Sequence, residues 1–85
     1  MNYFTNGNNA IQADTNAEAL RKRRIGIRLA ELRGDKTQGT VAEKLGVSTA
    51  AISMYENGKR MPKDTLKRRI ANLYGKSVEE IFFAE

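Results

Sequence analysis

The stretch TQGTVAEKLGVSTAAISMYENG, residues 37–58, decides the fold. Its apolar residues recur at intervals that suit two short helices joined by a tight turn. Ala42 leaves room for a second helix to cross, and Gly46 can adopt the positive φ that a three-residue turn requires. This spacing predicts a helix-turn-helix over residues 38–57, with residues 48–57 as its second helix.

The second helix of this unit has two different faces, because successive residues are rotated by about 100°. One face carries Ile52 and Tyr55 and is expected to pack. The other carries small or polar residues within an arc of roughly 140°: Thr49, Ala50, Ser53, Met54 and Asn57. Small side chains permit close approach, whereas a merely solvated face normally carries Lys and Glu. We therefore predict that this face enters a DNA major groove, with Asn57, Lys59 and Arg60 near phosphates.

Capping residues and apolar periodicity predict three further helices, which makes the chain all-α with five short helices. The first is expected to begin after the N-cap Asn16, to end at Gly34, and to bury Leu20, Ile25, Leu29 and Leu32. Thr37 and Ser48 are the predicted N-caps of the two helices in the central unit.

The last two helices are predicted from turn and capping signals. One opens at Pro62 and Asp64 and ends before Gly75. The other begins with a capping box, Ser77 to Glu80, and ends at Phe82 or Phe83. Two adjacent aromatic residues cannot both point inward, so an exposed Phe83 or Ile81 would suit a dimer contact.

The first sixteen residues contain five asparagines and show no helical period. We expect residues 1–16 to be a flexible polar tail and residues 17–85 to be the folded domain. The alternative, an arm that enters a DNA minor groove, is disfavoured because no Lys or Arg precedes Arg21.

The composition excludes several classes of function. The 85 residues allow one domain, and the absence of cysteine and histidine removes disulfides, the commonest metal ligands and the commonest general base. We expect no enzyme activity, no metal and no cofactor, and no small-molecule ligand is inferred. No apolar run could span a bilayer and no signal peptide opens the chain, so a cytoplasmic protein is expected.

The net charge of +5 favours a polyanionic partner only where the cations cluster. Two basic runs, Arg21–Arg24 and Lys67–Arg69, are interpreted as solvated helix faces, with phosphate contact as the alternative for the first.

Four segments resemble the Cro/repressor-type (Xre-like) helix-turn-helix family of bacterial and phage regulators: IGIRLAELR, TQGTVAEKLGVSTAAIS, YENGKRMP and GKSVEEIF. The resemblance covers about Ile25–Phe83 and implies a five-helix, lambda-repressor-like domain that binds operator DNA, usually as a homodimer. By matching position, it implies that Gln38 braces the third helix and that Arg33 forms a partly buried ion pair with Glu56. It also implies base contacts by Thr49, Ala50, Ser53 and Met54, and phosphate contacts by Gln38, Ser48, Asn57, Lys59 and Arg60.

This chain departs from the family in two places that concern stability. Only the four residues GDKT separate Arg33 from Gln38, which requires a tighter first turn. Gly39 replaces a better helix former, at a cost of about 1 kcal/mol relative to alanine.

The predicted base-contacting residues include none of the side chains that make bidentate contacts to guanine or adenine. We expect Ala50 and Met54 to contact thymine methyl groups and Thr49 and Ser53 to give one hydrogen bond each, with DNA deformability supplying the rest.

The function predicted from the sequence is repression of transcription at a pseudo-palindromic operator, whose half-sites lie about 34 Å apart. The alternative is an antitoxin or other protein-interaction module that autoregulates through the same domain. A membrane-surface role has only the segment 20–33 in its favour, without a Trp anchor.

Overall fold

The computed structural model describes the side chains of residues 16–84, and the backbone from residue 2 to residue 84. Its elements are α1 (Asn2–Arg33), α2 (Gln38–Leu45), α3 (Thr49–Glu56), α4 (Asp64–Tyr74) and the short π-helix η1 (Glu79–Phe83). Residues 2–84 contain no strand, which confirms the all-α prediction. The tail predicted for residues 1–16 lies almost wholly outside the residues with described side chains, so that boundary stays a prediction.

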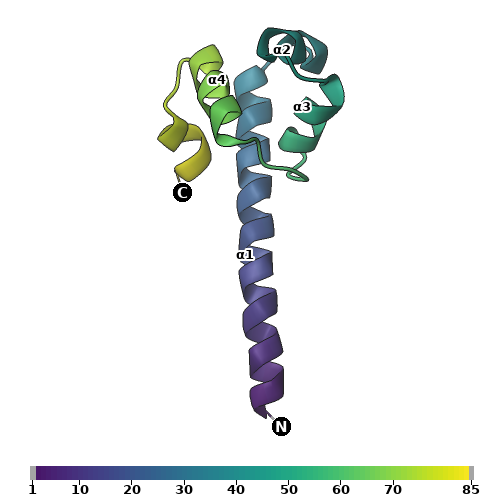
Figure 1. Ribbon diagram of the computed structural model, residues 1–85, viewed down its shortest axis with the longest axis vertical. Coiled ribbons are helices and arrows are strands. Elements are labelled where there is room, and N and C mark those ends of the chain that lie inside the picture. Colours follow the sequence, from purple (N-terminus) through teal and green to yellow (C-terminus); the bar gives the residue numbers. More distant parts are fainter. Residues whose placement is uncertain (1, 85) are drawn as a thin grey trace.

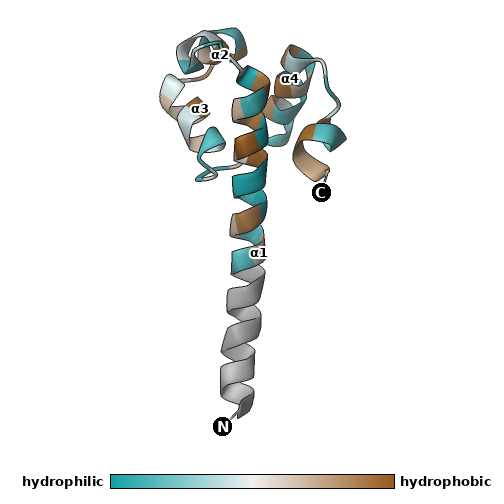
Figure 2. Ribbon diagram, turned by 180° about the vertical axis from the view of Figure 1, so that it is seen from behind, coloured by the Kyte–Doolittle hydropathy of each residue, from teal (hydrophilic) through white to brown (hydrophobic). Residues whose placement is uncertain are grey.

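The C-terminal part of α1 lies between two groups of helices. Figure 1 shows α2 and α3 on one side of it and α4 and η1 on the other. Apolar residues recur along this part of α1 between strongly hydrophilic ones, at the level where the other elements pack (Figure 2). The C-terminal part of α1 therefore packs between the helix-turn-helix and the last two elements, α4 and η1 (Figure 1).

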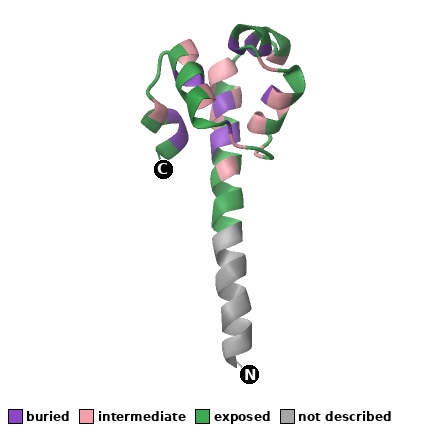
Figure 3. Ribbon diagram, in the orientation of Figure 1, coloured by how far each residue is buried: buried purple, intermediate pink, exposed green. Residues whose placement is uncertain are grey.

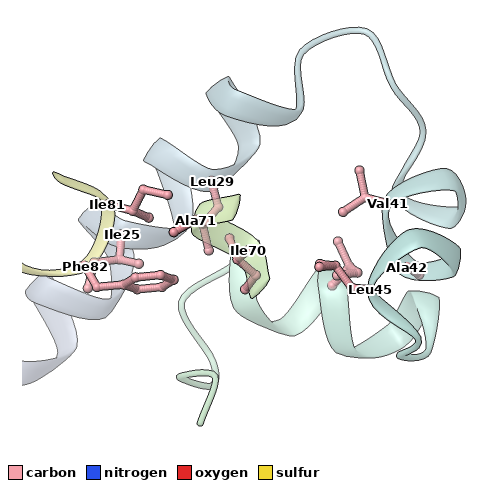
Figure 4. Packing of buried hydrophobic residues seen from close by; sticks show 10 residues of the cluster. Ile25, Leu29, Val41, Ala42, Leu45, Ile70, Ala71, Ile81 and Phe82 are labelled. Carbon is pink, nitrogen blue, oxygen red and sulfur yellow. The ribbon is translucent and has the colours of Figure 1, made fainter. Parts of the chain in front are cut away.

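The core is a single cluster of ten buried side chains, to which every element contributes. Ile25 and Leu29 of α1 lie close to Ile81 and Phe82 of η1, and Ile70 lies toward the α2 residues Val41 and Leu45 (Figure 4). The buried residues gather where the elements face one another (Figure 3). This cluster fixes the position of α3 through Ile52.

The predicted caps of the central unit are present. The hydroxyl of Thr37 accepts a hydrogen bond from the Thr40 amide, and that of Ser48 accepts one from the Ala51 amide, each at 3.0 Å. Gly46 ends α2 with φ of 71°, the left-handed conformation that the turn required. These local signals place α2 and α3 where the sequence predicted them.

Two predictions about α1 are wrong. Asn16 lies within the helix rather than at its N-cap. Leu20 is 51% exposed and takes no part in the core. It precedes Ile25 by five residues, a rotation of about 140° that carries it off the buried face.

The last helix differs from the predicted α-helix, because Glu79–Phe83 is π-helical. The capping box is present: the Ser77 amide donates to Glu80 at 2.9 Å, and the Glu80 amide donates to Ser77 at 3.0 Å. A π-helix has more residues per turn, so its neighbouring residues are rotated less. Ile81 and Phe82 are both buried, so Ile81 cannot serve as an exposed contact.

Lys67 also departs from its prediction as a solvated residue. Its ammonium lies 5.6 Å from the Phe82 ring centroid and 5.3 Å from that of Phe83, and its side chain is mostly buried. Lys67 therefore packs on the C-terminal aromatic residues.

Candidate nucleic-acid interface

The outer side of α3 carries the residues that the sequence predicted as base contacts. Thr49, Ala50 and Met54 are exposed, and Ser53 is half-buried beside them. We call these four residues the reading face. Besides the short hydroxyl side chains of Thr49 and Ser53, it presents only the methyl group of Ala50 and the thioether of Met54, so the helix backbone can approach a partner closely. The inner side of α3 is anchored in the core by Ile52.

Gly26 of α1 allows the end of α3 to lie directly on the α1 backbone. A Cβ atom at this position would lie 2.4 Å from the carbonyl oxygen of Glu56 and 2.8 Å from that of Tyr55. Only glycine fits such an approach without movement of one helix. The close approach at Gly26 therefore fixes the distance between α1 and the C-terminal end of α3, and with it the position of the reading face.

A second close approach involves the turn that follows α3. Gly58 has φ of 71°, and a Cβ atom there would lie 2.9 Å from the Cα atom of Arg23. Ala19, Arg23, Asn57 and Lys59 surround the same shallow hollow. Arg23 is thus the member of the basic run Arg21–Arg24 that lies beside the predicted phosphate contacts, whereas Arg21 lies over the Phe83 ring at 5.7 Å.

Glu56 joins the ends of three helices. The Arg33 Nε atom donates to Glu56 Oε2 at 2.7 Å, and Arg33 Nη2 donates to Glu56 Oε1 at 3.1 Å. Gln38 Nε2 donates to the same Oε1 at 2.9 Å. The ion pair and the brace that the family resemblance implied are both present in this geometry.

This network is shielded from solvent, since the Glu56 side chain is only 6% exposed. The hydrogen bond from Arg33 to Glu56 raises the pKa of Arg33. Burial raises the pKa of Tyr74, and the negative charge of Glu56 adds to this effect. Through its hydrogen bonds with Arg33 and Gln38, the carboxylate of Glu56 holds the end of α3 against α1 and α2.

The predicted phosphate contacts surround the reading face. Ser48, Asn57, Lys59 and Arg60 are exposed, and Gln38 is half-buried at the first turn of α2. Asn57 donates through Nδ2 to the Ser53 hydroxyl at 3.2 Å. The Ser48 oxygen accepts from Ala51, which leaves its own hydrogen available to an anion.

Other kinds of site find no support in the part of the chain that the structure describes. No cluster of three or more Asp, Glu, His or Cys side chains suited to a metal occurs there. No helix among those residues is long and apolar enough to cross a membrane.

The sequence analysis missed three residues of this region. An isolated glycine inside a helical pattern, such as Gly26, lowers helix propensity and can mark a position where packing requires a small residue. The sequence analysis assigned no contact to Gly58 and did not separate Arg23 from its basic neighbours. Their roles depend on how α1 crosses α3, which one-dimensional periodicity does not contain.

The comparisons with known proteins agree with this geometry. A family profile described as helix-turn-helix matches residues 19–81. An uncharacterized HTH-type transcriptional regulator of Methanocaldococcus jannaschii is 43% identical over 49 residues, which cover 58% of this chain and 74% of the relative. No solved structure gives a significant match. The chain belongs to the Cro/repressor-type helix-turn-helix family of DNA-binding regulators.

Proposed function

We propose that the protein is a sequence-specific transcriptional repressor that inserts α3 into the major groove of a pseudo-palindromic operator and binds it as a homodimer. The observation that carries this proposal is the reading face, which is mostly exposed and carries no charged or aromatic side chain, on a helix whose end is fixed at Glu56. Small exposed residues on a rigidly held helix suit groove entry, because bulky side chains would hold the backbone away from the base edges.

The charges around the reading face support the same function. Arg23 and Lys59 are exposed and border the same hollow as Asn57 at the C-terminal end of α3, and the exposed Arg60 follows Lys59 in the sequence. Cations in this position suit the two phosphate backbones that border a major groove. We therefore add Arg23 to the phosphate contacts implied by the family resemblance.

Base recognition in this proposal is largely apolar. Met54 and Ala50 contact thymine methyl groups, while Thr49 and Ser53 each form one hydrogen bond to a base edge. A Met54→Ala variant should then lose its preference for the thymine that it contacts and keep its stability, since the Met54 side chain is 41% exposed. Unchanged ranking of all operator variants by Met54→Ala would refute the contact.

Selection from a randomised duplex library at about physiological salt tests the function directly, since the non-specific phosphate term is then weak. We expect a two-fold symmetric consensus with half-sites about 10 base pairs apart. Enrichment of no sequence would refute specific readout. A consensus without two-fold symmetry would refute the homodimer but would still support base recognition by the reading face.

A further inference from the structure

An open hollow of about 350 Å³ lies between α3 and the start of α4. Its lining has an apolar part and a basic part, and the exposed Thr65 lies among them. The apolar part consists of Val47, Tyr55, Met61 and Leu66, and the basic part of Arg60, Lys63 and Arg69. We call this site the α3–α4 hollow.

The apolar part of the hollow is held in place by the core. All four of its side chains are half-buried and pack against the core cluster. The surface that the core leaves uncovered borders the hollow. A ring or a short hydrocarbon chain placed on it would remove apolar surface from water on both partners. The hollow therefore offers a preformed apolar floor to a ligand.

The three cations of the hollow have no carboxylate to balance them. Arg60, Lys63 and Arg69 are exposed, and none of them forms an ion pair or a hydrogen bond with the described part of the chain. No Asp or Glu lines the hollow. Asp64, the neighbour of Lys63 in the sequence, lies instead 3.6 Å from the Lys67 ammonium. The hollow is therefore positively charged, and its charges favour an anionic ligand.

Arg69 extends from α4 to the turn of the helix-turn-helix. Its Nη2 atom lies 3.7 Å from the point that a Cβ atom of Gly46 would occupy, between α2 and α3. Val47, the next residue of that turn, lines the hollow itself. One wall of the hollow therefore belongs to the turn that leads into the reading face.

Other hollows bordered by described residues do not combine these two properties. Three of them contain a carboxylate in their lining. The hollow at Arg23 and Lys59 contains none, but Ala19 is its only apolar side chain. The α3–α4 hollow combines unbalanced cations with an apolar floor.

We propose that the α3–α4 hollow binds a small amphipathic anion, an organic acid that carries one aromatic ring or a short hydrocarbon chain. The apolar part of the ligand packs on the floor, and the acid group lies among the cations, where Arg60 and Arg69 can each donate two hydrogen bonds. The volume of the hollow is at the lower end of the range for small-ligand sites, which suits one ring rather than a helix.

Occupation of the hollow opposes DNA binding, and this part of the proposal rests on the proposed function. Arg60 is one of the predicted phosphate contacts, so a bound anion neutralises a charge that attracts the DNA backbone. The antagonism is reciprocal, since DNA must lower the affinity for the anion by the same factor. A small anion can thus release the protein from its operator.

Anilinonaphthalene sulfonate is the probe for this site, because it joins aromatic rings to one anionic group and fluoresces in apolar surroundings. A titration without DNA should show one saturable site. Phenylnaphthylamine, which has the same rings and no sulfonate, should bind much more weakly, and inorganic sulfate at the same concentration should not displace the probe. Equal binding of the charged and the uncharged probe would overturn the role of the cations.

Two neighbouring arginines of α4 provide a matched pair of variants. Arg69→Gln should lower the affinity for the sulfonate about fivefold, the effect of one unit charge at close range in water. Arg68 is equally exposed but borders a different hollow. Arg68→Gln should lower the affinity by less than about twofold, because its charge is screened at that distance. Equal losses would mean that net charge alone attracts the probe, and would overturn the proposal.

Amide NMR shifts locate the probe without any substitution. We expect the largest shifts at Val47, Met61 and Leu66. The competing position is Phe83, whose exposed ring has the Arg21 and Lys67 cations near its centroid. Largest shifts beside Phe83 would place the probe there and overturn the hollow as its site.

A duplex with one half-site separates this proposal from the proposed function. The sulfonate should weaken binding of that duplex to the wild-type chain, and much less to Arg69→Gln. Binding of the sulfonate in the hollow by a chain that shows no sequence-selective DNA binding refutes the function alone. The hollow is instead a further DNA phosphate contact, and the proposal is overturned, if Arg69→Gln keeps its affinity for the sulfonate and reduces the salt slope of DNA binding by about 0.9.

Discussion

Arg33 and Glu56 join the last residue of α1 to the last residue of α3 by two hydrogen bonds, of 2.7 and 3.1 Å. Each residue ends its helix, so the pair fixes the angle between the two helices at their ends. Gln38, the first residue of α2, donates to the same carboxylate. Glu56 is thus the point at which the position of the reading face is determined.

The first prediction concerns this ion pair. Arg33→Met should lower the free energy of unfolding by about 1–3 kcal/mol, because a nearly buried carboxylate would keep only Gln38 as a partner. Chemical denaturation measures the change. Asp64→Asn is the matched control, since Asp64 is 92% exposed and pairs with Lys67 at 3.6 Å. That variant should change stability by less than about 0.5 kcal/mol, and equal losses in the two variants would contradict the role of Arg33.

A second prediction follows from the crossing at Gly26. Gly26→Ala places a Cβ atom against the backbone of α3, which must shift, and should cost about 1–3 kcal/mol despite the better helix propensity of alanine. The displaced reading face should also weaken DNA binding. Thermal unfolding and a binding titration measure the two effects.

Gly39→Ala is the comparison for the glycine prediction, because a Cβ atom there has no neighbour closer than 3.8 Å. It should raise stability by about 1 kcal/mol through helix propensity alone. A stabilised Gly26→Ala variant would show that α1 and α3 can separate without cost.

The third prediction separates two arginines in one basic run. Arg23→Gln should reduce the slope of log binding constant against log salt concentration by about 0.9, the value for one lost phosphate contact. Arg21→Gln should leave the slope unchanged, because Arg21 lies over Phe83 on another side of α1. Equal effects of the two variants would mean that the run acts only through its total charge.

The fourth prediction concerns acid unfolding. Hydrogen bonds from Ser77 hold the pKa of Glu80 below its ordinary value. A carboxyl with a lowered folded pKa stabilises the fold above its unfolded pKa, and this contribution is lost as the pH falls through the folded value. Glu80→Gln should therefore unfold with a shallower dependence on pH in the acid range than the wild-type chain. Melting temperatures measured through that range give the comparison, and parallel curves would exclude the contribution.

The elements of the helix-turn-helix were predictable because their signals are local. Thr37, Ser48 and Gly46 form their capping hydrogen bonds with residues no more than four positions away. Both partners of each hydrogen bond therefore lie in the same short segment of the sequence. The capping box at Ser77 was found for the same reason. The matching family positions supplied the Arg33 and Glu56 pair, which periodicity alone could not have given.

The predictions that depended on packing at a distance were less successful. Leu20 was assigned to the core by its apolar character, although its angular position on α1 excludes it. Ile81 and Phe82 are both buried in the core cluster that η1 forms with the other elements, so their burial depends on residues distant in sequence. Lys67 was interpreted by its charge, whereas its side chain is mostly buried and its ammonium lies over two aromatic rings.

The placement of α3 has a consequence for altering what this protein recognises. α3 is held in place by Ile52, by the close backbone crossing at Gly26 and by the carboxylate of Glu56. None of these contacts involves the exposed side of α3. We therefore expect that Thr49, Ala50 and Met54 can be randomised together without loss of the fold.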